Sequence, residues 1–533
     1  MQKALLLALL MGATAVAGCL ATDQPPPAPA GWSLDCTLGS HERGLAGGGG
    51  WAQDCITRAS HTAGAKQEVW LAVNPLDADN VIVGAKDLDS AISRNCVWNG
   101  IFVTHDGGAS WKNVYISGKY ADRRSDSPYY GYACNTDPMG VFTADGTAHW
   151  VIEMYNLFGD NGYGPLGTDP SSGRGILQPG WKLVLAHSHD GGDTWPLGEV
   201  TTLEYGDGAA ALNDYSRIAL NPETGTVHTM INTWFPGIGT NTSPLPVQPP
   251  VYPGGELCSI LGYKAGGTVQ AVGLQPRVQT GMANPGNLNC LGIAANANGT
   301  LVLGAIGNPT PAAGTPAAPN ATFSTWFATS TDDGVTWSDF APGFAYPSIP
   351  GQFKESKYRT GTNFEMAYDQ GTGPRAGTLY AIYAADGRKA TTGGLAGGDD
   401  ADVYVRASRD DGRTWGEAVR VNGDAVGHQF MANLAVAADG SVHAFYMDKS
   451  YDPDHRLIDI TYARSADGGE HWNRSRVTTM SFDGELGRHQ ENFPFIGDYI
   501  GAGAVGDTVW GAFPDASNGK VTVIGATKVT LAP

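Results

Sequence analysis

The sequence predicts an all-β protein, a single β-propeller of seven four-stranded antiparallel blades, with a six-bladed ring as the alternative. The chain has 74 glycines and 32 prolines among 533 residues, only 16% of its residues are charged, and its apolar runs are short and bounded by turn residues. A hairpin pattern returns seven times and an octapeptide that ends in tryptophan returns five times. Such repeats favour one repeat architecture over the several domains that this length would ordinarily suggest.

The N-terminus predicts export. MQKALLLALLMGATAVAGC has a lysine, a leucine-rich stretch too short to span a bilayer, and small residues that lead to Cys19. VAGC (Val16–Cys19) resembles the bacterial lipobox, which implies that residues 1–18 are removed and that Cys19 carries lipid; an ordinary cleaved signal is the alternative. Residues 19–33 are Pro-rich and suit an extended tether. We therefore expect a protein of the bacterial cell envelope that meets the membrane only through a lipid anchor.

Six cysteines remain once Cys19 is assigned to lipid, and they allow 15 disulfide connectivities. Pairing in sequence order would close three short loops, so we favour 36–55, 96–134 and 258–290. Residues 34–65 are then a disulfide-bearing segment ahead of a propeller at 66–533. No Cys/His spacing is typical of zinc, and acidic stretches such as GGDDAD (397–402) could bind calcium or be a solvated loop. We expect no metal and no cofactor.

The formal net charge of −19 argues against a nucleic-acid partner and disfavours a long polyanion. It still permits a small anionic sugar held by local arginines. We expect a monomer whose partner is a glycan or a protein.

The hairpins define the repeat. Each is an apolar strand, a turn and a second strand that ends in Asp or Asn, which is a β-hairpin signal. The second strands end 62 to 78 residues apart, at Asp87, Asn156, Asn232, Asn308, Asp386, Asp448 and Asp515. This step fits one four-stranded blade with generous loops.

The octapeptides are predicted to be turns that join the third and fourth strands of five blades. They read THDGGASW from 104, SHDGGDTW from 188, STDDGVTW from 330, SRDDGRTW from 408 and SADGGEHW from 465. The aspartate can accept backbone hydrogen bonds, glycine supplies a positive φ and tryptophan packs beneath the turn. Five copies cannot form one active site, so we assign a structural role to Asp106, Asp190, Asp332, Asp410 and Asp467.

Strand direction separates two faces of the predicted ring. The turns between first and second strands share a face with the octapeptides. The other connections, including residues 233–257 and 388–400, lie on the opposite, upper face, where propellers commonly bind ligands around the axis.

Five such octapeptides, or Asp boxes, together with these hairpins over residues 66–533, resemble the sialidase-like (BNR repeat) β-propellers. The resemblance implies three arginines that clamp a carboxylate, an Asp acid/base, and a Tyr nucleophile activated by a Glu. Bidentate guanidinium groups match a carboxylate, and a neutral Tyr approaches an anionic sugar more easily than a carboxylate does. The sequence departs from the family in lacking its Arg-Ile-Pro motif and in having seven hairpins, where six blades are usual.

Candidate site residues gather where the chain enters the inner strands. GRHQENFPFIGDY (487–499) and NDYSR (213–217) both hold an Asp-Tyr pair. The catalytic candidates are Asp498, Tyr499, Glu491 and Asp214. The substrate-binding candidates are Arg217, Arg359, Arg488, Asp137, Asp448 and Asp515.

Each acidic candidate could instead cap a strand end, Arg217 could form a structural ion pair, and Tyr499 could simply cover the core. If the ligand is an anionic sugar, Arg217, Arg359 and Arg488 should converge in the upper funnel near Asp498 and Tyr499. Two functions remain open: a propeller that recognises a glycan or a protein, and an exo-glycosidase of sialidase type.

Overall fold

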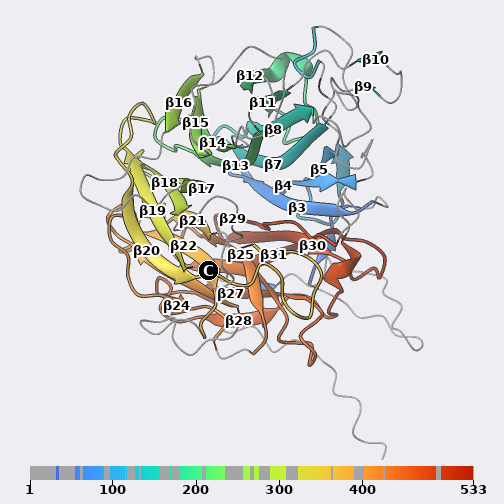
Figure 1. Cartoon of the computed structure of the whole chain (residues 1–533), viewed down its shortest axis with the longest axis vertical. Helices are drawn as coiled ribbons and strands as arrows, with labels where there is room; N and C mark the ends of the chain where they lie inside the picture. Colours follow the sequence, from blue (N-terminus) through green and yellow to red (C-terminus); the bar gives the residue numbers. More distant parts are fainter. Residues whose placement is uncertain are drawn as a thin grey trace, which may run out of the picture.

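Seven antiparallel β-sheets form a ring, and each sheet is one blade of a propeller (Figure 1). The structure is a computed structural model that describes residues 32–34, 55–60, 64–88, 97–114, 116, 126–130, 132, 134–156, 168–169, 174–175, 180–206, 212–234, 256–264, 269–274, 288–307, 322–361, 364–388, 401–423, 426–487 and 494–531. The predicted seven blades are confirmed, and the six-bladed alternative is wrong.

Six blades are built from strands in chain order, with the first strand innermost. The first has β3 (Lys66–Asn74), β4 (Asp77–Asp87), β5 (Trp98–Thr104) and β6 (Lys112–Val114). The second has β7 (Cys134–Phe142), β8 (Ala148–Asn156), β11 (Gly180–Ser188) and β12 (Val200–Gly206). The third has β13 (Leu212–Leu220), β14 (Val227–Trp234), β15 (Glu256–Tyr263) and β16 (Gln270–Leu274).

The fourth blade has β17 (Leu288–Ala295), β18 (Leu301–Gly307), β19 (Thr322–Ser330) and β20 (Ala341–Pro347). The fifth has β21 (Phe364–Tyr368), β22 (Leu379–Ala385), β23 (Asp402–Ser408) and β24 (Val419–Arg420). The sixth has β25 (Gln429–Val436), β26 (Val442–Asp448), β27 (Asp459–Ser465) and β28 (Asn473–Arg476). A short pair, β9 (Thr168–Asp169) and β10 (Arg174–Gly175), and two 3-10 turns, η2 (Leu197–Glu199) and η4 (Gly484–Leu486), complete the elements outside the seventh blade.

The seventh blade joins the two ends of the described chain. β29 (Gly501–Val505), β30 (Thr508–Asp515) and β31 (Val523–Leu531) supply three strands, and β1 (Trp32–Leu34) is the fourth, antiparallel to β31. β2 (Thr57–Arg58) also pairs with β31. Residues ahead of position 66 therefore contribute strands to the propeller. The inner strand β29 contacts both β25 and β3, which closes the ring.

All five Asp boxes follow the third strand of a blade and share one face, which we call the box face. In the second box, Asp190 Oδ1 accepts the Thr194 backbone N–H at 2.9 Å and its Oδ2 accepts the Thr194 hydroxyl at 2.6 Å. Trp195 Nε1 donates to the Gly192 carbonyl at 2.9 Å. The fourth-blade box also binds the neighbouring blade, since Asp333 Oδ2 accepts the Thr226 hydroxyl at 2.6 Å. The bonds within a box stabilise its turn, and the bond to Thr226 connects the turn to the neighbouring blade.

The cysteines confirm one predicted disulfide, Cys258–Cys290, which joins the third and fourth blades. Cys55 and Cys134 are also in disulfides, and the partners predicted for them, Cys36 and Cys96, lie outside the described residues, as does Cys19. Among the residues that the structure describes, none of the helices has the length and hydropathy required to span a membrane.

Candidate functional site

The upper ends of the inner strands are distorted in a recurring way. In β3, β7, β13 and β25 the register with the next strand shifts, which marks a β-bulge. At each bulge one non-glycine residue has a positive φ: 53° at Glu68, 46° at Asp137, 62° at Tyr215 and 49° at Met431. This conformation is costly for residues with a Cβ and is concentrated at functional sites. Three of the four residues belong to one group of polar side chains near the axis.

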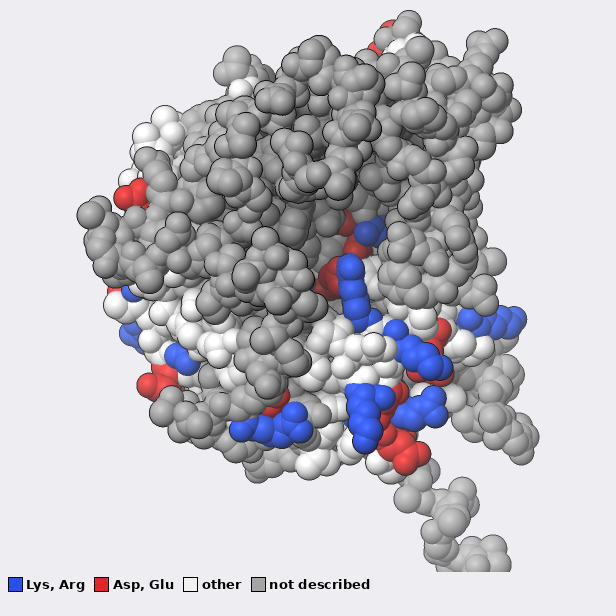
Figure 2. Space-filling view, viewed as in Figure 1, with Lys and Arg blue, Asp and Glu red and all other residues white. Residues whose placement is uncertain are grey.

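We call this group the axial polar cluster; it comprises Glu68, Lys86, Asp137, Tyr215, Arg217, Arg359, Glu365, Asp498 and Tyr499. Figure 2 shows acidic and basic side chains side by side in a hollow near the middle of the molecule. The segment that leads into the seventh blade packs closely against β3 at Gly497. A Cβ on Gly497 would lie 2.5 Å from the Glu68 backbone nitrogen, so only glycine permits this approach.

Glu68 and Asp137 form a buried carboxyl pair bridged by Lys86. The Lys86 ammonium is ion-paired with Glu68 Oε2 and lies 3.3 Å from Asp137 Oδ1. Burial raises the pKa of Glu68 well above its usual value, and the charge of Asp137 adds to the rise. Burial alone would also raise the pKa of Asp137, but Lys86 and hydrogen bonds from Glu68 and Thr136 lower it to about 2. Burial therefore favours the neutral form of Glu68, whereas the surroundings of Asp137 favour its carboxylate.

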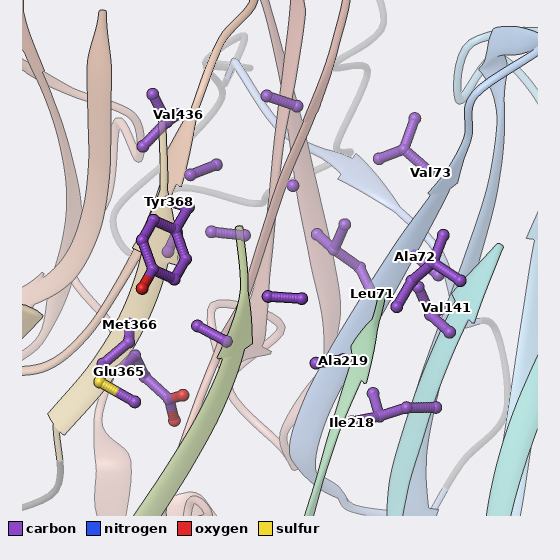
Figure 3. A pocket seen from close by; sticks show the side chains of 18 of the residues that line it. Leu71, Ala72, Val73, Val141, Ile218, Ala219, Glu365, Met366, Tyr368 and Val436 are labelled. Atoms are coloured by element: carbon purple, nitrogen blue, oxygen red, sulfur yellow. The ribbon is translucent and has the colours of Figure 1, made fainter. Parts of the chain in front are cut away.

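Arg217 is buried beneath this pair and is bound to Glu365. Its Nε and Nη2 donate to Glu365 Oε1 at 3.2 and 2.8 Å, and its Nη1 donates to the Ser216 carbonyl at 2.9 Å. The guanidinium carbon lies 3.9 Å from the ring centroid of Tyr215 and 4.5 Å from that of Tyr499. Side chains from the third, fifth and seventh blades thus meet across the axis. Figure 3 shows the Glu365 carboxylate pointing between the inner strands.

Tyr499 and Asp498 stand at the entry to the seventh blade. The Tyr499 hydroxyl is buried and has no hydrogen-bond partner among the described residues. Burial raises its pKa well above the usual value, and Asp137 and Glu68 raise it further. Asp498 receives a bidentate ion pair from Arg359, with Nε to Oδ1 at 2.9 Å. The Arg359 side chain is 54% exposed and covers the Phe495 ring at 4.6 Å, so it offers an accessible cation at the rim.

The structure therefore brings together five of the ten predicted site residues: Asp137, Arg217, Arg359, Asp498 and Tyr499. Arg217 and Arg359 are each paired with a carboxylate, so they do not form a clamp of unpaired guanidinium groups. Asp448 and Asp515 are buried at strand ends, where they accept hydrogen bonds from Gln429, Thr461 and Ser517. Asp214 pairs with Asn232 in the β13–β14 ladder, and Arg488 and Glu491 lie outside the described residues.

Sequence reasoning missed Glu68, Lys86 and Glu365. Glu68 and Glu365 lie near the start of inner strands, within the otherwise apolar stretches QEVWL and FEMAY. A charged residue in an otherwise apolar buried strand requires a partner. Comparing the starts of the inner strands would therefore have marked Glu68 and Glu365 as members of a charged site.

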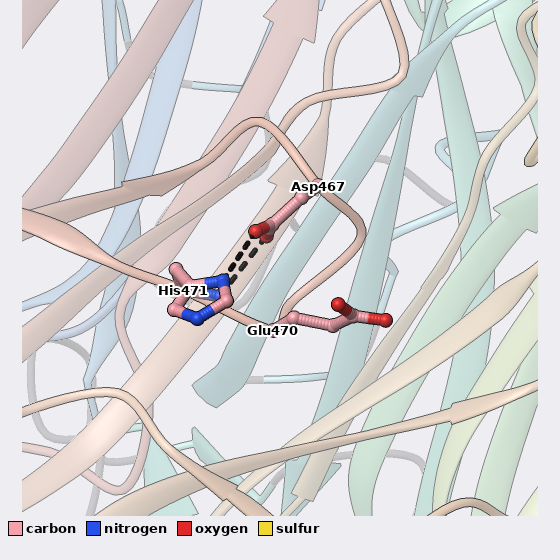
Figure 4. A group of neighbouring side chains, drawn as sticks. All are labelled: Asp467, Glu470 and His471. Carbon is pink, nitrogen blue, oxygen red and sulfur yellow. Dashed lines mark hydrogen bonds and ion pairs between the residues drawn. The ribbon is translucent and has the colours of Figure 1, made fainter.

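The fifth Asp box holds the only group of three metal-type ligands found in the described residues. Ligand atoms of Asp467, Glu470 and His471 lie within 4.8 Å of one another (Figure 4). His471 Nδ1 lies 2.6 Å from Asp467 Oδ2 and takes the place that a hydroxyl occupies in the other boxes. His471 is largely exposed on the box face, so this group is separate from the axial polar cluster. Of the calcium candidate at 397–402, Asp402 is buried and accepts a hydrogen bond from Asn422, whereas 397–400 lie outside the described residues.

These features define a seven-bladed β-propeller with a charge-rich axial cluster at one end of its inner strands. No protein-family model and no curated protein matches the chain. Among solved structures it is similar to a Hadza microbial sialidase, at 14% identity and a TM-score of 0.42, over 85% of this chain and 76% of that one. It is also similar to the intramolecular trans-sialidase from Ruminococcus gnavus, at 12% identity and a TM-score of 0.43, over 78% of this chain and 98% of that one. A third similar structure is a PL25 ulvan lyase, at 11% identity and a TM-score of 0.47, over 88% of this chain and 94% of that one.

Proposed function

We propose that the protein is an exported, lipid-anchored propeller of the cell envelope that recognises a glycan over its axial polar cluster. The observation that carries this proposal is the pairing of charges within the cluster. Each of its three cations lies against a carboxyl group: Lys86 against Glu68 and Asp137, Arg217 against Glu365, and Arg359 against Asp498.

A cluster of paired charges suits a ligand that is rich in hydroxyl groups. Each sugar hydroxyl can donate to a carboxylate and accept from a guanidinium or ammonium group. A ligand carboxylate would have to displace Glu365 to bind Arg217, or displace Asp498 to bind Arg359. A neutral sugar, or a neutral part of a longer glycan, therefore fits best.

Glycan binding by the mature protein tests the proposal. A glycan array first identifies the glycan that the wild-type protein binds most tightly. We expect Arg359→Ala to weaken binding to that glycan at least about tenfold, equivalent to about 1.4 kcal/mol. Lys357→Ala is the matched control, because Lys357 is an exposed cation two residues away that forms an ion pair with Glu485. Equal loss in both variants, or binding only to proteins, would contradict the proposal.

Mass spectrometry of the mature N-terminus tests the anchor at Cys19.

The second candidate function is glycoside hydrolysis, and it is favoured by the Tyr499 hydroxyl, which has no hydrogen-bond partner in the described part of the chain. A buried phenol beside the carboxyl pair of Glu68 and Asp137 would supply a nucleophile and an acid/base in one place. Turnover of aryl glycosides by the purified protein would establish this function.

A further inference from the structure

A cavity of about 380 Å³ runs along the axis between the inner strands. All seven inner strands contribute to its wall, which combines apolar side chains such as Leu71, Val141, Ile218 and Leu434 with polar groups. Figure 3 shows this wall from close by, with β3 residues on one side and Tyr368 and Val436 on the other. Small-molecule sites commonly have volumes of about 300–1,000 Å³, mainly apolar walls and a few placed polar groups.

The cavity opens on the box face. Pro75, Pro222 and Gln370 line it and are exposed, and they belong to turns between first and second strands, on the same side of the ring as the Asp boxes. At the opposite end the lining residue Arg217 is only 2% exposed and is packed against Tyr215 and Tyr499. A ligand would therefore enter from the face opposite the axial polar cluster.

The deep end of the cavity presents a hydrogen-bond acceptor on a largely buried side chain, that of Glu365. The Glu365 side chain is 9% exposed, lines the cavity, and binds Arg217 through Oε1 alone. Its Oε2 has no hydrogen-bond partner among the described residues. A carboxylate oxygen that is largely removed from water is stabilised by a hydrogen-bond donor, so this atom favours a ligand that brings one.

The Arg217–Glu365 pair also selects the charge of that donor. A ligand ammonium group would approach Glu365 but meet the repulsion of the adjacent Arg217, and a ligand carboxylate would meet the repulsion of Glu365. A hydroxyl donates one hydrogen bond and brings no charge out of water.

We propose that the axial cavity is a second ligand site, entered from the box face, for a small neutral molecule with an alkyl or aryl body and one hydroxyl that donates to Glu365 Oε2. The apolar side chains of the wall contact the body of the ligand, and Glu365 Oε2 accepts the hydrogen bond of its hydroxyl. This site is separate from the glycan site proposed on the upper face.

A set of probes with one body and different head groups tests the proposal by isothermal titration calorimetry at pH 7. We expect 4-propylphenol to bind at least about tenfold more tightly than its methyl ether, which keeps the body but cannot donate. 4-Propylbenzoate and 4-propylbenzylamine should bind more weakly than the phenol. Absence of phenol binding, or equal affinity for phenol and ether, overturns the proposal.

Two variants locate the binding. Ala504→Phe and Ala367→Phe place a large side chain at partly exposed lining positions on two different blades, and we expect both to weaken phenol binding at least tenfold. Val335→Phe is the matched control, because Val335 is exposed on an Asp box and does not line the cavity. Folding of each variant is checked by urea unfolding. Wild-type affinity in both cavity variants overturns the assignment, and unchanged phenol binding in Arg359→Ala separates this site from the glycan site.

Discussion

Arg217 and Glu365 form a buried ion pair that joins the third and fifth blades across the axis, with Arg217 Nη2 at 2.8 Å from Glu365 Oε1. Neither side chain is more than 9% exposed. The pair separates the axial polar cluster from the axial cavity and contributes to both.

We expect Glu365→Ala to lower the free energy of unfolding by about 3–5 kcal/mol, because it leaves the buried guanidinium of Arg217 without its counter-ion. The double variant Arg217→Met/Glu365→Leu should lose less than the single variant, since it removes both charges. Urea unfolding measures both. The more exposed Arg359–Asp498 pair gives the control, and Arg359→Ala should lower the free energy of unfolding by no more than about 1 kcal/mol. A double variant less stable than Glu365→Ala would contradict this account.

The Asp boxes should affect stability and not ligand binding. Asp190→Ala removes the bonds to Ser188 and Thr194 that close the second box, so we expect a loss of about 1–3 kcal/mol in unfolding free energy. Asp454→Ala, at an exposed position in another loop, should change stability by less than about 0.5 kcal/mol. Glycan affinity should be the same in both variants. Loss of binding without loss of stability in Asp190→Ala would show that the box face carries the site.

The fifth box should make stability depend on pH in a way that the other boxes do not. The hydrogen bond and charge of Asp467 raise the pKa of His471 above its ordinary value. Burial opposes ionisation of Asp467, but hydrogen bonds from the His471 backbone and ring hold the pKa of Asp467 at about 2. The stabilisation is therefore complete below the unfolded pKa of His471 and is lost as the pH rises through its higher folded pKa.

His471→Thr tests that dependence, because threonine occupies the equivalent place at Thr194, Thr336 and Thr414. The wild-type melting temperature should fall, relative to this variant, as the pH rises from 6 to 9. Titration of the His471 ring by NMR gives the folded pKa directly. A ring pKa at or below about 6.5 would contradict the prediction.

The blade count followed from sequence because hairpins and Asp boxes are local: turn chemistry and strand alternation are encoded within about 20 residues. The closing strand Trp32–Leu34 was missed because three residues show no periodicity, and its partner β31 lies at the other end of the chain. The axial polar cluster was found only in part for a similar reason. Asp137, Arg217 and Tyr499 were visible at strand starts, whereas Glu68, Lys86 and Glu365 gain their significance from bulges and from partners on other blades.

Tyr499→Phe distinguishes the two functions proposed for the upper face. The variant removes only a hydroxyl that has no hydrogen-bond partner among the described residues, so the unfolding free energy should change by less than about 1 kcal/mol. If Tyr499 is a nucleophile, turnover of aryl glycosides should fall by about two orders of magnitude or more while glycan affinity stays within about threefold. Tyr446→Phe is the control, because it removes a buried hydroxyl from the core between the fifth and sixth blades, away from the cluster. Undiminished turnover in Tyr499→Phe would remove Tyr499 as the nucleophile. If the wild type binds glycans and turns over none of the aryl glycosides, the buried hydroxyl serves recognition, and its loss should then weaken binding.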